Sequence, residues 1–206
     1  MNKKDLNILK NQLRESFIQN GIDSLTEIQI IQLLLSYSDD ADFDKKSQEL
    51  ALSYNDLNTI IDTDSYLLMN TMKISNRTAV LIKIISQLSR LRAINQSDIR
   101  FLNTADSAKE YFKNYFIGAY NEEFVVSAVS PRFKIIDTAT LSSGTSTYVK
   151  SSCREIIDFA IARNAKMLFI AHNHPESTPD PSAGDISATR NIAEILGKIG
   201  IHLIDH

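Results

Sequence analysis

Two histidines placed two positions apart are the clearest sign of chemistry in this sequence. His172 and His174 are two of only four histidines in the chain. They follow the apolar stretch KMLFIA, which predicts a buried strand. Side chains at i and i+2 of an extended chain point the same way, and Pro175 keeps His174 out of helical geometry. We therefore expect the two imidazoles to lie on one side of a strand end.

Asp185 could complete a metal site with these histidines. It follows the loop ESTPDPSAG and opens a predicted helix over about 185–198. Two imidazole nitrogens and one carboxylate oxygen, with a fourth position left to water, are typical of a catalytic zinc site. An alternative needs no metal, because Ser182 and Asp185 also form an S-x-x-D helix cap and paired histidines can be exposed loop residues. The spacing alone leaves both interpretations open.

The elements that must position these residues differ between the two halves of the chain. In the first half, apolar spacings of three and four predict a helix over 6–17, ended by Gly21. Ser24 and Glu27 form a capping-box pattern before the apolar run IQIIQLLL. A longer helix over about 76–91 has one apolar stripe, made of Val80, Ile84, Leu88 and Leu91.

From about residue 105 onward, helices and strands alternate. A helix over about 105–117 leads into β-branched, alternating segments, and a further helix precedes the strand that ends at the histidines. The predicted strands are 123–130, 133–142, 145–150, 166–171 and 201–205, with the further helix at 153–164. The sequence predicts an all-helical domain over 1–95, a linker near 94–103, and an α/β (α+β) domain over 103–206.

Composition excludes several classes of protein. Of the 206 residues, 43% are hydrophobic, and no run approaches the roughly 18 apolar residues that span a bilayer. The N-terminus has no apolar signal-peptide core, and the single cysteine, Cys153, excludes an internal disulfide framework. We predict a cytoplasmic protein that does not bind a membrane.

Charge is unevenly distributed along the chain. Residues 1–72 carry six basic and twelve acidic side chains, whereas residues 73–100 carry six basic side chains against one acid, Asp98. This second stretch could face the phosphates of DNA. More often such a run is only the solvated side of an amphipathic helix.

The stretch HNHPESTPDPSAGD carries a longer pattern: His-x-His, seven residues, Ser, two residues, Asp. This is the signature of the JAMM (JAB1/MPN+) zinc metalloproteases. With AHNHP and the pairs Gly144-Thr145, Arg154-Glu155 and Asp205-His206 around it, the chain resembles the RadC family, a bacterial branch of that fold, over about 105–206. The resemblance implies a JAMM/MPN-like domain with a mixed β-sheet flanked by helices.

The resemblance also implies a role for each residue of the signature. His172, His174 and Asp185 would hold one Zn²⁺ per chain. Glu122 would take a proton from the attacking water, with Glu123 as its alternate, because neighbouring strand residues point to opposite faces. Ser182 would donate a hydrogen bond to the developing oxyanion. The implied activity is hydrolysis of an amide or isopeptide bond in a peptide or protein whose identity the sequence does not give.

Three further residues have plainer interpretations. Cys153 lies near a helix start without a histidine beside it in sequence, and we expect it to be structural. His202 is expected to pack in the last strand. His206 corresponds to the histidine of the family's Asp-His pair, and a role as fourth ligand stays open.

The sequence departs from the family at two places. It stops at IHLIDH, where relatives continue with another strand, so the domain could be truncated at its C-terminal end. The first half resembles the RadC helix-hairpin-helix region, but the turn MKISNRTAV has Lys73 and Ser75 where glycines are expected. Because the RadC family that the chain resembles is associated with DNA repair, a DNA-associated module linked to repair or recombination is the competing hypothesis. In it Lys73, Arg77 and Lys83 contact DNA, and the metal is structural or serves phosphodiester hydrolysis.

Overall fold

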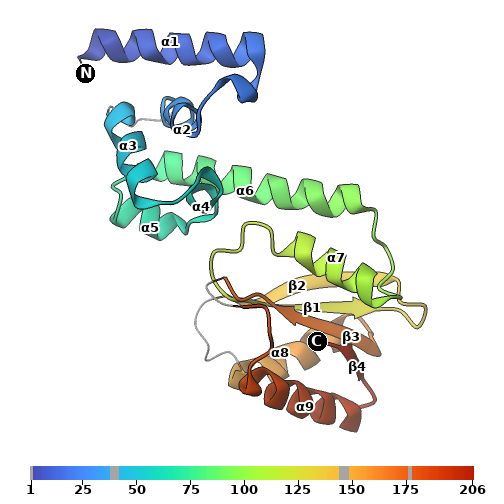
Figure 1. Cartoon of the computed structure of the whole chain (residues 1–206). Coiled ribbons are helices and arrows are strands. Elements are labelled where there is room, and N and C mark those ends of the chain that lie inside the picture. The colour runs from blue at the N-terminus through green and yellow to red at the C-terminus, as the bar shows by residue number, and fades with distance from the viewer. Residues whose placement is uncertain (1, 38–41, 144–148, 176–177) are drawn as a thin grey trace. The chain divides into compact units, whose positions relative to one another are not determined.

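The computed structural model describes residues 2–37, 42–143, 149–175 and 178–206. Its contacts divide the chain into two compact units, Met1–Ser89 and Arg90–His206. The first is helical, and the second contains a mixed sheet with helices (Figure 1). The predicted fold class is confirmed.

The N-terminal unit is built from short helices around one apolar core. Its elements are α1 (Lys3–Asn20), the 3₁₀ turn η1 (Ile22–Ser24), α2 (Glu27–Leu35), α3 (Phe43–Ser53), α4 (Leu57–Asp62), α5 (Ser65–Asn70) and the beginning of α6 (Asn76–Ser97). Gly21 ends α1 with a φ of 77°, as its position predicted. The buried core is formed by Ile31, Leu35, Phe43, Leu50, Ile60, Leu68, Ile74, Ala79 and Ile82.

Two predictions about these helices are wrong. The capping box of α2 is formed by Thr26 and Gln29, not by Ser24 and Glu27: Thr26 Oγ1 accepts from the Gln29 amide, and Gln29 Oε1 accepts from the Thr26 amide. Ser24 instead ends the 3₁₀ turn, where its hydroxyl donates to the Gly21 carbonyl. Both S/T-x-x-E/Q patterns fit the rule, and the turn that follows Gly21 determines which one is used.

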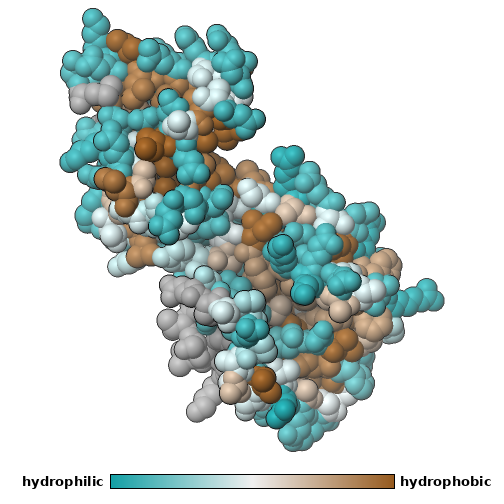
Figure 2. Space-filling view, viewed as in Figure 1, coloured by the Kyte–Doolittle hydropathy of each residue, from teal (hydrophilic) through white to brown (hydrophobic). Residues whose placement is uncertain are grey.

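The second error concerns the face of α6 that is buried. The predicted stripe is exposed, from 48% for Ile84 to 57% for Leu88. Apolar surface is visible on this unit in Figure 2. The buried side chains of α6 are Thr78, Ala79, Ile82 and Ser86. This face is built mainly from small side chains, which a search for large apolar residues overlooks.

The C-terminal unit contains a four-stranded sheet within the described residues, in the order β2-β1-β3-β4. Its strands are β1 (Glu123–Val129), β2 (Ile135–Ser143), β3 (Met167–His172) and β4 (His202–Asp205). β1 runs antiparallel to β2 and β3, and β3 runs parallel to β4. The sheet is therefore mixed, with β2 and β4 at its two edges.

Helices cover both faces of this sheet (Figure 1). On one face, α8 (Val149–Ala162) and α9 (Ala183–Lys198) pack on the even-numbered side chains of β1 and β3, among them Phe124 and Ile170. On the other, α7 (Ala105–Tyr115) packs on odd-numbered side chains such as Val125 and Phe169. Alternation along β1 and β3 thus directs successive apolar side chains to opposite cores.

The predicted strand over 145–150 is wrong in its described part. Residues 145–148, like Gly144, lie outside the described residues, and Val149 and Lys150 begin α8. The helix therefore starts four residues before the predicted Cys153. Throughout the part of the chain that the structure describes, no helix has the length and apolar character needed to cross a bilayer.

Candidate metal centre

The two histidines lie where β3 leaves the sheet. His172 is the last residue of β3, and its ring lies on the face covered by α8 and α9, because it pairs with Phe124 of β1. His174 follows two residues later. The two side chains are only 10% and 15% exposed. As predicted from strand alternation, both imidazoles lie on one side, with ring centroids 4.6 Å apart.

Asp185 is held in place by the beginning of α9. Ser182 is the N-cap residue of this helix, and its Oγ accepts a hydrogen bond from the Asp185 amide at 3.1 Å. In return, Asp185 Oδ2 accepts from the Ser182 amide at 2.7 Å. The helix cap and the metal site, which appeared as alternatives in the sequence, are thus compatible, because the cap leaves Asp185 Oδ1 directed at His172.

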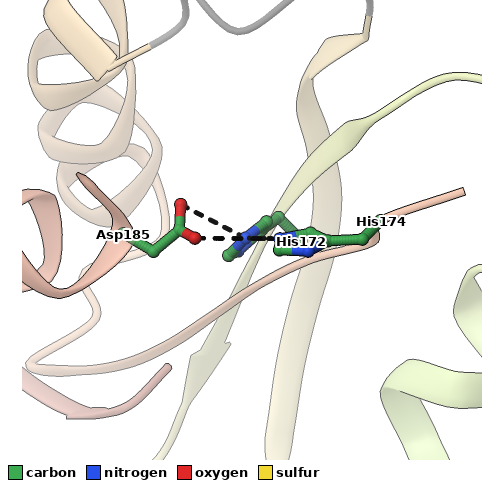
Figure 3. Close-up of side chains that lie close together, drawn as sticks. All are labelled: His172, His174 and Asp185. Atoms are coloured by element: carbon green, nitrogen blue, oxygen red, sulfur yellow. Dashed lines mark hydrogen bonds and ion pairs between the residues drawn. The ribbon is translucent and has the colours of Figure 1, made fainter. Parts of the chain in front are cut away.

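Figure 3 shows the three side chains converging. His172 Nε2 lies 3.4 Å from Asp185 Oδ1, and His174 Nε2 lies 3.7 Å from Asp185 Oδ2. The two Nε2 atoms are 2.6 Å apart. One ligand atom from each residue lies within 4.8 Å of the others. Within the described residues these three side chains form the only such group, and His206 is not part of it.

The hydrogen bonds around His174 show which of its atoms could bind a cation. Its Nδ1 lies 2.9 Å from the Thr178 carbonyl oxygen, which can only accept. Nδ1 therefore carries the proton, and Nε2 presents a lone pair to His172 Nε2 and to the Asp185 carboxylate. Electron-rich atoms this close together require a proton or a cation between them. Two imidazoles and a carboxylate fit zinc, which takes such ligands in tetrahedral sites.

Burial and neighbouring charges alter how these groups titrate. Burial lowers the pKa of His172, with a further contribution from His174, while the carboxylates of Asp185 and Glu122 oppose the change. Burial works against ionisation of Asp185. Hydrogen bonds from Ser182, together with electrostatic attraction from His172 and His174, nevertheless bring its pKa below the ordinary value. These changes favour neutral His172 and ionised Asp185 at neutral pH, the protonation states that metal binding requires.

The register of β1 against β3 separates the two candidate glutamates. Phe124 pairs with His172, so Glu122, two residues earlier, continues the face on which His172 lies. Its negative charge acts on His172. Glu123 pairs with Ser143 of β2 and belongs to the opposite face, covered by α7. Of the pair, Glu122 is the one that the strand brings to the histidines.

Asn173 holds the start of β1 against the end of β3, a role that the sequence did not indicate. Its Oδ1 accepts from the Glu123 amide at 2.7 Å, and its Nδ2 donates to the Asn121 carbonyl at 3.1 Å. Both bonds flank Glu122. The position of Asn173 between two histidines was a possible signal, since its side chain must point away from theirs.

A cavity of about 840 Å³ lies beside the three side chains. It extends from the histidines along α9 and β4. Besides the site itself, its lining includes Pro181, Ile186, Arg190, Leu203 and Ile204. The candidate metal centre is therefore at the wall of a largely apolar cavity, as is common for sites that bind a ligand.

The other residues singled out in the sequence lie away from this centre. Arg154, on α8, pairs with Asp158 at 3.7 Å in a strongly exposed ion pair. Cys153 is half-buried and packs against the core between α8 and the sheet. His202 is exposed, so the expectation that it packs is wrong. Asp205 accepts from the His206 amide through Oδ1.

The three basic residues proposed for DNA belong to the turn between α5 and α6 and to α6 itself. Lys73 has a φ of 55°, the left-handed conformation for which glycine was expected. Its Nζ donates to the Asn70 carbonyl, and its own carbonyl accepts from Lys46. Arg77 and Lys83 each have an interaction within the chain. Ser75 Oγ accepts from the Thr78 amide at 3.3 Å, an amide that a bound phosphate would need.

Comparison with known proteins agrees with this geometry. The mixed sheet flanked by helices, with two histidines and an aspartate at its end, defines a JAB-type domain, and the family model of the RadC-like JAB domain matches residues 102–206, just over half of the chain. The chain is also 28% identical over 216 residues to the UPF0758 protein FN0909 of Fusobacterium nucleatum, an alignment that covers 100% of this chain and 93% of that protein. The chain belongs to the RadC-like JAB domain family.

Proposed function

We propose that this protein is a zinc-dependent hydrolase of the JAMM type that cleaves an amide or isopeptide bond in a peptide or protein. The observation that carries the proposal is the convergence of His172, His174 and Asp185, whose ligand atoms lie within 4.8 Å of one another. Bound zinc would polarise a carbonyl and lower the pKa of water towards neutrality.

The residues of the chain supply the rest of the chemistry. His172, His174 and Asp185 hold the ion. Glu122 accepts the proton of the attacking water and passes it to the leaving nitrogen, which its place on the His172 face of the sheet supports. Ser182, fixed as the N-cap of α9, donates a hydrogen bond to the oxygen on which negative charge develops. The cavity beside the site would receive the chain to be cleaved.

Zinc content tests the proposal first. We expect about one zinc ion per chain in purified wild type by plasma mass spectrometry, and its loss in His174→Ala and Asp185→Ala. Peptide and isopeptide substrates can then be screened with the loaded protein. Folded wild type that takes up no zinc, even when metal is added, would overturn the proposal.

The DNA-associated hypothesis has less support from the described residues. Ser75 already caps α6, and Arg77 and Lys83 already have partners in the chain. Fluorescence anisotropy with a short duplex distinguishes the two functions. DNA binding that weakens steeply with salt, and that disappears on charge reversal of Arg77 and Lys83, would favour the DNA-associated module.

A further inference from the structure

His206 lies behind His172, on the side away from the proposed zinc. Its Nε2 is 2.8 Å from His172 Nδ1, and the two ring centroids are 4.8 Å apart. The residue follows β4, which pairs with β3. Its ring also lies edge-to-face with the ring of Phe124, with centroids 6.1 Å apart. His206 is thus placed to control the orientation of a ligand without binding the ion.

The direction of the hydrogen bonds follows from one carbonyl group. Thr189 Oγ1 lies 2.6 Å from the Asp185 carbonyl oxygen and must donate to it. The Thr189 oxygen is then an acceptor for His206 Nδ1, with which it is also hydrogen bonded. His206 therefore carries its proton on Nδ1 and presents the lone pair of Nε2 to His172. His172 Nδ1 donates to that lone pair, which leaves His172 Nε2 unprotonated and directed at the site.

His174, the other proposed histidine ligand, is oriented by a hydrogen bond to a nearby main-chain carbonyl. His174 Nδ1 donates to the carbonyl of Thr178, four residues away in the same loop. For His172 the equivalent acceptor comes from a residue 34 positions later in the chain. Hydrogen bonds of this kind fix the tautomer and ring orientation of metal-binding histidines, and their loss typically weakens metal affinity about 10- to 100-fold.

We propose that His206 and Thr189 are positioning residues for the metal centre: together they hold His172 as the tautomer whose Nε2 binds zinc. The inference rests on the proposed function. It makes the packing of β4 and α9 against β3 a condition for tight metal binding, since His206 follows β4 and Thr189 lies on α9. Both residues also line the cavity beside the site, but neither belongs to the group of three proposed ligands.

The test compares zinc affinities measured by competition with a chromogenic chelator. We expect His206→Leu and Thr189→Val to weaken zinc binding about 10- to 100-fold. His206→Gln, which keeps an acceptor near the position of Nε2, should recover most of the affinity. His202→Leu is the matched control, a histidine on the same β4 segment that is exposed and away from the site, and it should bind zinc like wild type.

A spectroscopic readout separates positioning from a general loss of structure. In the zinc-loaded wild type, ¹⁵N-resolved NMR should show the His172 proton on Nδ1, protected from exchange with water. In His206→Leu that proton should exchange rapidly. If His206→Leu does not fold, as judged by circular dichroism, Thr189→Val and His206→Gln decide the matter.

The outcomes distinguish the two proposals. If wild type binds zinc and neither Thr189→Val nor a folded His206 variant differs from it, the positioning role is wrong while the hydrolase proposal stands. If wild type binds no zinc, both fail. If His206→Gln is as weak as His206→Leu while His202→Leu is normal, hydrogen bonding is not the cause, and the inference is also overturned.

Discussion

Glu122 immediately precedes β1 and Glu123 begins it, so the two neighbours are directed to opposite faces and form a matched pair for testing the chemistry. Glu122→Gln keeps the shape of the side chain but cannot accept a proton. We expect it to lower the rate of substrate hydrolysis about 10²- to 10⁴-fold, because a positioned general base contributes about that much. Zinc content should not change.

Glu123→Gln is the control for that experiment. Its side chain belongs to the face that α7 covers, so hydrolysis and zinc content should both stay close to wild type. A rate lost in Glu123→Gln and kept in Glu122→Gln would mean that the register of β1 does not identify the base.

His206, which lies behind His172, makes the stability of the metal-free protein depend on pH. Burial lowers the pKa of His206 to about 4, with His172 adding to the effect, against an ordinary value of 6.5. The residue as a whole is exposed, but its ring is in contact with His172 and Phe124. Between these two pH values the unfolded chain binds a proton that the folded chain does not. Stability that is complete above about 6.5 should therefore be lost progressively as the pH falls towards 4.

Urea unfolding of chelator-treated protein at several pH values measures this effect. His206→Gln removes the titrating ring, so its stability should fall less steeply with decreasing pH. His202→Gln should keep the wild-type slope, because that ring is exposed. Equal slopes in wild type and His206→Gln would show that His206 is not the group responsible.

At the level of helices and strands, local patterns predicted that the three proposed ligands lie close together. His172 and His174 are related by strand alternation, and Asp185 is positioned by the first turn of α9, whose N-cap residue is Ser182. Each of these relations spans at most a few residues. Glu122, His206 and Thr189 join the site through pairing of β1 and β4 with β3 and through packing of α9. Such relations depend on long-range register, which periodicity in a single sequence does not contain.

The orientation of α6 was mispredicted for a related reason. The helix has large apolar residues on more than one face, and periodicity favoured Val80, Ile84, Leu88 and Leu91. The core instead accepts Ile82 among small side chains. Which face is buried depends on how closely the neighbouring helices approach, and that is a property of the assembled unit.

Ile82 and Ile84 test this correction on one helix with one residue type. Ile82 is 2% exposed and Ile84 is 48% exposed. Ile82→Ala should lower the free energy of unfolding by about 2–5 kcal/mol, since it leaves a cavity in the core. Ile84→Ala should change it by no more than about 0.5 kcal/mol. Urea denaturation followed by circular dichroism measures both, and a larger loss for Ile84→Ala would restore the orientation predicted from sequence.

For the whole molecule, the division into two units predicts where zinc stabilises the chain. All three proposed ligands lie in the unit Arg90–His206, whose cores are separate from the core formed by α2 to α6. A ligand that binds only the folded state stabilises it by about 2.7 kcal/mol at a free concentration one hundred times its dissociation constant. That free energy should appear first in β3 and α9, which carry the proposed ligands His172 and Asp185.

Hydrogen exchange measured by mass spectrometry, with and without zinc, shows which segments of the chain zinc stabilises. Peptides from β3 and α9 should exchange more slowly when zinc is bound, and peptides from α1 to α5 should be unchanged. Asp185→Ala, which removes a ligand, should abolish the difference. Because the ion can slow exchange only in segments whose opening releases it, an equal slowing in α1 to α5 would mean that the two units open together and that zinc stabilises the whole chain as one cooperative structure.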